Sequence, residues 1–267
     1  MAAFTDLDDL AVVMTGGGAA APENVWAYKS MYLQGNTVPL STSTGTWKSW
    51  WNHTGNPGYG TLPGTVAAPT SSTNGAIPFT NASGGRTKYV VQAIPLGPSN
   101  SAFNTMLYDR LLHLGNLTMA SASSQTVGGT LTRNTGGLGN EVWIEVETGT
   151  AGTKDCTITY TNQAGTGSKT STMEIGNGAT SPGTLYRMPL AAGDTGVRSV
   201  ESVQLASTSG SGTFGVVIAN PLLMFGPEGK SMIEPPWPVV EDNACLALAS
   251  RFTSGSPIVW SIMLAER

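Results

Sequence analysis

The chain has 267 residues and a formal net charge of -4, and 11% of its residues are charged, whereas a soluble domain usually has about 25%. Lysine and arginine do not cluster, the closest approach being Arg86-Thr87-Lys88, so we expect no binding of nucleic acid through its phosphates. No apolar run approaches the ~20 residues that span a bilayer, and residues 1–9 lack a signal-peptide pattern, so we expect synthesis in a cytoplasm and no membrane partner.

Residues 5–14 predict a short amphipathic helix. Thr5 is a candidate N-cap residue at its start. Leu7, Leu10 and Met14 fall on one face of such a helix. Because a helix of this length is only marginally stable by itself, its apolar stripe needs burial on the chain's own body or on a partner. We take Leu7, Leu10 and Met14 as candidate partner-binding residues.

Residues 1–95 combine this helix with a segment that is poor in repeated pattern. Only residues 25–33 and 88–94 are expected to form strands. Such a segment is typical of a region that wraps over another surface, and large aromatic side chains supply contact area for wrapping. Four tryptophans of this segment are therefore candidate partner-binding residues: Trp26, Trp47, Trp50 and Trp51.

Residues 96–267 predict a β domain. Short apolar stretches alternate with turns rich in Gly, Thr and Ser, and residues 141–147 alternate strictly between polar and apolar side chains. Candidate strands lie near 105–114, 127–132, 141–148, 155–161, 170–175, 184–189, 198–206, 213–220, 244–252 and 257–264. So many short strands predict an all-β fold, a jelly-roll-like β-sandwich preceded by the short N-terminal helix and the irregular Trp-rich extension.

Residues that could carry catalysis are nearly absent from the sequence. His53 lies in a loop and His113 on an expected strand, and no Gly-x-Ser-x-Gly motif accompanies them, so no nucleophilic triad is expected. The histidines and cysteines lack zinc-ligand spacing, and Cys156 and Cys245 are expected to be buried free thiols. We therefore expect no catalytic residue, no metal and no cofactor, and we predict that the chain is not an enzyme.

Three carboxylates share one face of an expected strand. Glu141, Glu145 and Glu147 do so because side chains alternate along a strand with a period of two. A glycosidase needs two carboxylates about 5–10 Å apart across a cleft. Three carboxylates in a row on one face instead favour a charged, solvated stripe on the surface.

Four segments carry a resemblance to a known family. They are Leu107-Tyr-Asp-Arg-Leu-Leu-His-Leu-Gly, Thr126-Val-Gly-Gly-Thr-Leu-Thr-Arg-Asn-Thr-Gly-Gly, Thr157-Ile-Thr-Tyr-Thr-Asn-Gln-Ala-Gly-Thr and Arg187-Met-Pro-Leu-Ala-Ala-Gly-Asp-Thr-Gly-Val-Arg-Ser-Val. Together with residues 4–10, 22–24 and 84–89, they resemble a family of tailed-bacteriophage virion structural proteins. The resemblance covers most of the chain.

The resemblance implies a structural protein of the phage head that acts as a decoration or cement protein and is made in the host cytoplasm. Residues 1–95 would then contact the capsid, and residues 96–267 would form the oligomerising β domain. The implied partners are the major capsid protein and further copies of the chain, with a homotrimer expected because decoration proteins commonly sit at threefold positions. No catalytic residue is implied.

Other functions remain open on the sequence. A neck, collar or tail-attached virion protein would be present in few copies rather than many. A carbohydrate-binding module or receptor-binding tip would need exposed, coplanar tryptophans on the sandwich. A glycoside hydrolase would need carboxylates such as Glu141 and Glu145 in a cleft.

Overall fold

The computed structural model describes residues 22–33, 47–96, 103–149, 152–176, 181–208, 211–225, 236–252 and 258–267. Within these ranges the secondary structure consists of strands, and every strand pairing is antiparallel. The strands are β1 (Glu23–Leu33), β2 (Trp47–Ser49), β3 (His53–Asn56), β4 (Lys88–Leu96), β5 (Phe103–Thr118), β6 (Gln125–Gly128), β7 (Glu141–Val146), β8 (Lys154–Asn162), β9 (Lys169–Ile175), β10 (Thr184–Arg187), β11 (Val197–Leu205), β12 (Thr213–Phe225), β13 (Val239–Val240), β14 (Leu246–Phe252) and β15 (Ile258–Glu266). The helix expected over residues 5–14 lies outside the described residues.

A closed barrel forms the centre of the molecule, with the strand order β10-β2-β14-β5-β12-β7. Its two longest strands, β5 and β12, pair with each other along most of their length. Side chains alternate between the interior and the exterior along each strand of a barrel, and a barrel with this few strands is filled by its inward side chains. The barrel therefore has one inner core and an outer surface that other elements can cover.

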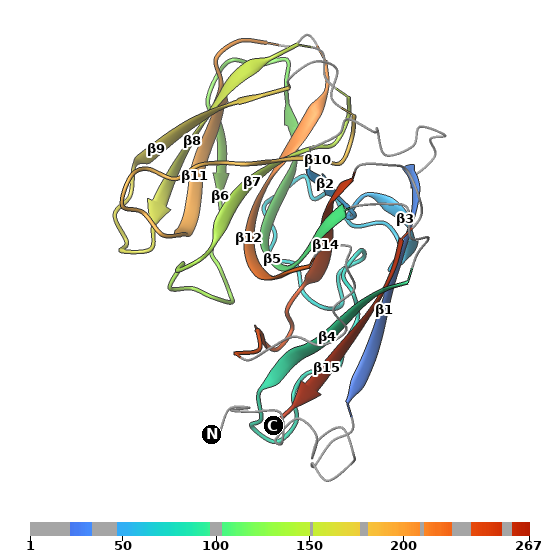
Figure 1. Ribbon diagram of the computed structural model, residues 1–267. Helices are drawn as coiled ribbons and strands as arrows, with labels where there is room; N and C mark the ends of the chain where they lie inside the picture. The colour runs from blue at the N-terminus through green and yellow to red at the C-terminus, as the bar shows by residue number, and fades with distance from the viewer. Residues whose placement is uncertain are drawn as a thin grey trace.

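Two open sheets cover opposite sides of this barrel (Figure 1). The sheet β6-β11-β8-β9 lies at the upper left of the view, where Ile158 packs with Ile144 and Phe214 of the barrel wall. The sheet β13-β4-β15-β1-β3 contains the strands at the lower right, where Trp260 packs with Leu248 of the barrel. The expected all-β class is confirmed, and the packing of sheet on sheet occurs twice, with the barrel as the shared layer.

The strands expected after residue 96 are all present, with shifted ends. The strand expected near 127–132 is the most displaced and ends at Gly128. Gly128 and Gly129 have φ angles of 69° and 90°, a backbone conformation that turns the chain out of the sheet. Three strands were not expected, β2, β3 and β13, and they have four residues or fewer, too few to show an alternating pattern.

The five-stranded sheet joins the first and the last of the described strands. β15 pairs with β1 on one side and with β4 on the other, so strands from before and after residue 96 are neighbours. β2 likewise pairs with β10 and β14 and closes the barrel. The division into residues 1–95 and 96–267 therefore runs through the sheet and the barrel, and part of the expected irregular extension is regular β structure.

Candidate functional site

Two carboxylates at the end of β7 point into the barrel, not into solvent. Glu145 is 1% exposed, and Glu147, directly after the strand, is 5% exposed. The alternate residues Val142, Ile144 and Val146 pack against the four-stranded sheet. The expected solvated stripe is therefore wrong for Glu145 and Glu147, because the apolar face of β7 is covered by a second sheet and the other face lines the barrel interior.

Arg110 of β5 lies within this polar interior and is fully buried. Its guanidinium donates hydrogen bonds to a carboxylate oxygen of Glu145 and, at 3.1 Å, to Nε2 of His113. The guanidinium also lies 4.4 Å from the centre of the Trp51 ring, which makes a cation–π contact. Burial opposes the charge on Arg110, but the Glu145 carboxylate raises the pKa of Arg110 above its ordinary value. A charged guanidinium is thus held inside the barrel.

Hydrogen bonding fixes the ionisation state of His113. Arginine has no acceptor atom, so Nε2 of His113 accepts the bond from Arg110, and the proton of the neutral ring lies on Nδ1. Burial, together with the positive charge of Arg110, lowers the pKa of His113 well below 6.5. Tyr108 also accepts a bond from Arg110, at 3.3 Å, and burial raises the pKa of Tyr108 to about 12. The ion pair is therefore surrounded by neutral groups.

Glu147 lies beside a bulge in β5. Opposite Gly215 of β12, β5 has two residues, Gly115 and Asn116. Asn116 has a φ of 59°, and its backbone N–H donates a hydrogen bond to Oε2 of Glu147 at 2.8 Å. A Cβ atom on Gly115 would lie 2.4 Å from Oε1 of Glu147, and one on Gly215 would lie 2.9 Å away. The two glycines and the bulge thus make room for a buried carboxylate.

The cluster of Arg110, His113, Glu145 and Glu147, here called the barrel cluster, is incompletely hydrogen-bonded. Three of its buried atoms have no hydrogen-bond partner among the described residues: Arg110 Nε, Glu145 Oε1 and Glu147 Oε1. Polar atoms in such interiors are usually satisfied by ordered water. All four side chains are at most 5% exposed, so a substrate does not reach them in this conformation. The chemistry open to the cluster is the binding and release of a proton.

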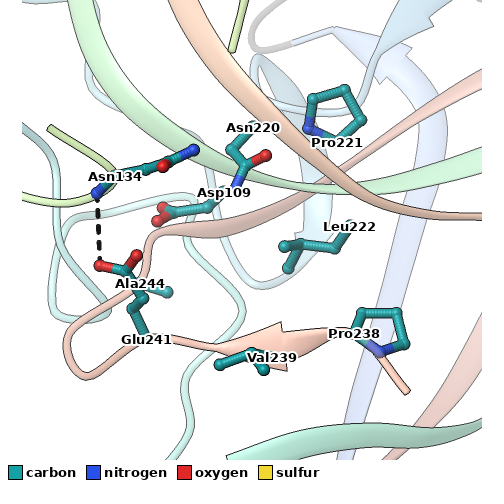
Figure 2. Close-up of a pocket in the computed structure, with 9 residues that line it drawn as sticks. All are labelled: Asp109, Asn134, Asn220, Pro221, Leu222, Pro238, Val239, Glu241 and Ala244. Atoms are coloured by element: carbon teal, nitrogen blue, oxygen red, sulfur yellow. Dashed lines mark hydrogen bonds between the residues drawn. The ribbon is translucent and has the colours of Figure 1, made fainter. Parts of the chain in front are cut away.

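A second polar site opens to the surface as a groove of about 280 Å³ (Figure 2). Asp109 in this groove accepts two hydrogen bonds from Arg133, both at 2.8 Å, and one from the backbone N–H of Cys245 at 2.7 Å. Glu241 accepts a hydrogen bond from the backbone N–H of Asn134 at 3.4 Å. The groove is lined by Asp109, Asn134, Asn220, Pro221, Leu222, Pro238, Val239, Glu241 and Ala244. Its two carboxylates already have partners within the chain.

The candidate tryptophans lie mostly in the chain's own interior. Trp50 is 3% exposed and packs under the five-stranded sheet, and Trp51 is 1% exposed in the barrel. Trp47 is half-buried against the same interior, and Trp26 lies on β1, where its side chain is not described. Trp50 and Trp51 therefore act as core residues, because folding already covers the rings that were expected to meet a partner. The other candidates, Leu7, Leu10 and Met14, lie outside the described residues.

Both cysteines are buried free thiols, as expected. Burial raises the pKa of Cys156 and that of Cys245 to about 12, so neither is a reactive thiolate at neutral pH. His53 is also buried. In the described part of the chain, no three His, Cys, Asp or Glu residues come together as ligands for a metal ion. The same part contains no helix long and apolar enough to cross a membrane.

The comparisons with known proteins give weak matches. No family model and no curated protein matches the chain. A structure of infectious bursal disease virus strain Gx has 10% identity and a TM-score of 0.19, with 92% of this chain and 78% of that chain covered. The VP2 subviral particle of infectious bursal disease virus has 10% identity and a TM-score of 0.21, with 96% and 85% covered. T=1 particles derived from infectious bursal virus have 12% identity and a TM-score of 0.21, with 96% and 82% covered. Scores of this size establish neither a shared fold nor a shared function.

The buried polar residues were not recognised in the sequence. Asp109, Arg110 and His113 interrupt the apolar segment Leu107–Leu114, and this interruption was a usable signal. A charge within an otherwise apolar strand has to be paired on folding, since an unpaired buried charge is too costly. The partners Glu145 and Arg133 carry no such signal, because each lies in a stretch that also fits a solvated strand or turn.

Proposed function

We propose that the chain is a structural protein of a tailed-phage virion, a decoration or cement protein of the head. The observation that carries the proposal is the scarcity of charge, because 11% of the residues are charged and some of these are buried. Of the 13 Lys and Arg and the 17 Asp and Glu residues, at least four of each kind are buried. The buried charged residues are Lys48, Lys88, Arg110, Arg133, Asp109, Glu145, Glu147 and Glu266.

The surface that remains is therefore about as poor in charge as the composition implies. Charge is what keeps the surfaces of separate molecules apart, and a surface rich in Thr, Ser and Gly is suited to close packing against neighbours. A symmetric shell supplies such neighbours, because each copy buries the same faces. The resemblance of the four segments to tailed-phage virion proteins points to the kind of particle. The partners we propose are the major capsid protein and two further copies of this chain.

The alternative of another class, a carbohydrate-binding module, receives less support. It needs exposed, coplanar aromatic rings, and five of the seven tryptophans are buried. These five are Trp50, Trp51, Trp143, Trp237 and Trp260. A glycosidase is disfavoured in the same way, because Glu145 is paired with Arg110 inside the barrel and a sugar does not reach it. A neck, collar or tail position within the virion remains the second candidate.

The proposal is tested by the stoichiometry of the chain in purified phage particles. Quantitative mass spectrometry against the major capsid protein is expected to give many copies per particle, in a ratio set by the capsid lattice. A few copies per particle would favour the neck or tail alternative. Absence from purified particles would contradict a virion role. Light scattering of the full chain at micromolar concentration tests the trimer, and a clean monomer would contradict it.

A further inference from the structure

We propose that the barrel cluster is a proton-operated switch, in which Glu147 takes up one proton and thereby stabilises the barrel at the β5 bulge. The proposal starts from the unequal surroundings of the two oxygens of Glu147. Oε2 accepts the backbone N–H of Asn116 at 2.8 Å. Oε1 has no hydrogen-bond partner among the described residues and lies 3.9 Å from Nε2 of His113. One half of this buried carboxylate is satisfied, and the other half is not.

No neighbouring cation is available to pair with Glu147. Arg110 is already paired with Glu145, and its second hydrogen bond ends on Nε2 of His113. Protonation of His113 at Nε2 would set two N–H donors against each other, so this ring stays neutral while Arg110 is in place. Lys48 of β2 donates instead to the hydroxyl groups of Ser181 and Thr184.

The remaining groups that influence Glu147 do not supply a positive charge. From β7, Glu145 adds a second negative charge. From β12, Thr213 offers only a side-chain hydrogen bond. With Arg110 paired to Glu145, the cluster is electrically neutral when Glu147 carries a proton and has one unpaired negative charge when it does not. The low-dielectric interior therefore favours the protonated form.

The pKa of Glu147 agrees with this geometry. The net effect of its surroundings raises this pKa from 4.5 to about 7, chiefly through burial and also through the charge of Glu145, whereas the Asn116 N–H, the Thr213 side chain and the charge of Arg110 lower it. A carboxyl group with a raised pKa binds its proton more strongly in the folded chain than in the unfolded chain. Its contribution favours folding below pH 4.5, is lost as the pH rises from 4.5 to about 7, and stays lost above that. Glu147 therefore responds within the neutral range.

The β5 bulge connects this proton to the backbone. Asn116 is held in a left-handed conformation, with a φ of 59°, and its N–H is directed at Glu147. The adjacent Gly115 donates its N–H to the carbonyl oxygen of Pro63 at 2.7 Å, so the loop over the barrel is fastened at the same place. An ionised Glu147 needs water at Oε1, and Gly115 of the bulge is the part of the barrel wall that lies against this oxygen. Local opening of the barrel wall is therefore expected first at the β5 bulge.

The test compares the melting temperature of the full chain with that of Glu147→Gln between pH 5 and pH 8. Glutamine keeps an oxygen for the Asn116 N–H but does not ionise. The difference between the two proteins is the measured quantity, because His113 contributes an opposite slope to both. We expect the variant to melt near the wild-type temperature at pH 5 and about 5–10 °C above it at pH 8. A control variant, Glu174→Gln, changes an exposed carboxylate on β9 and is expected to give a constant difference.

A difference between wild type and Glu147→Gln that stays constant across this pH range would overturn the proposal. A second measurement does not depend on any variant. Carbon-13 NMR of glutamate carboxyl groups in the wild-type chain is expected to show one group that titrates near pH 7, whose signal is absent from Glu147→Gln. Hydrogen exchange at Asn116 is expected to show lower protection at pH 8 than at pH 6, after correction for intrinsic rates. A titration midpoint below pH 5 for every glutamate would equally refute the switch.

Discussion

Replacing Arg110 by methionine tests whether the barrel is held by a charged pair that is fully removed from water. Arg110 is 0% and Glu145 is 1% exposed, so the pair is desolvated on all sides. Arg110→Met leaves Glu145 without its donor, and Oε1 of Glu145 already lacks one. Breaking a buried pair from one side costs about 3–5 kcal/mol, because the remaining charge is buried and unpaired. We expect the free energy of unfolding at pH 8 to fall by this amount.

The double change Arg110→Met, Glu145→Met removes both charges. It is expected to be more stable than the single change, since replacing a whole buried pair by apolar side chains is often neutral. Urea denaturation of the full chain, followed by tryptophan fluorescence, measures both variants. Arg187→Met is the matched control, because Arg187 pairs with Glu141 but is 38% exposed, and exposed pairs contribute about 0–1 kcal/mol. If Arg110→Met costs no more than Arg187→Met, the buried pair does not hold the barrel.

Three further outcomes are expected. Burial lowers the pKa of Lys48 from 10.5 to about 8, so the folded chain binds this proton less strongly than the unfolded chain, and stability should rise by about 3 kcal/mol from pH 8 to 10.5. In urea titrations Lys48→Met should lose this slope, and an unchanged slope would contradict the burial of its ammonium group. A fragment of residues 96–267 lacks β1 and β4, the two neighbours of β15, so both edges of β15 would be left unpaired. We expect light scattering to show that this fragment aggregates instead of forming a defined oligomer, and a folded, soluble fragment would refute this. Leu7→Asp with Leu10→Asp should reduce particle-bound protein while circular dichroism stays unchanged, and full occupancy would count against docking by this stripe.

The β strands could be predicted because their signal is local. Alternation in residues 141–147 and the turns between stretches are properties of neighbouring residues, and they located the strands after residue 96 closely. The pairing of β1 with β15 joins residues more than two hundred positions apart. No local pattern encodes such a pairing, so residues 25–33 were expected to be a strand but not to share a sheet with the end of the chain.

The site could not be predicted because whether a face of a strand is buried or exposed depends on which other elements pack against it. Glu145 and Glu147 alternate with apolar residues along the strand. In a sheet that is covered only on its apolar face, both carboxylates would lie in solvent. β7 instead has a sheet on one side and the barrel interior on the other. The same reasoning holds for Trp50 and Trp51, which lie on opposite sides of one barrel wall and so enter two different cores.

The four segments that carry the family resemblance meet in pairs in the structure. Asp109 of the first accepts two hydrogen bonds from Arg133 of the second, which fastens the loop after β6 to β5. Asp194 of the fourth accepts hydrogen bonds from Tyr160 and Asn162 of the third, both at 2.7 Å, which fastens the loop before β11 to β8. A resemblance built on residues that hold loops to strands bears on the fold of the chain. In the proposed virion role, the position on the particle would depend on the sparsely charged outer surface instead, because partners would contact that surface and not these links.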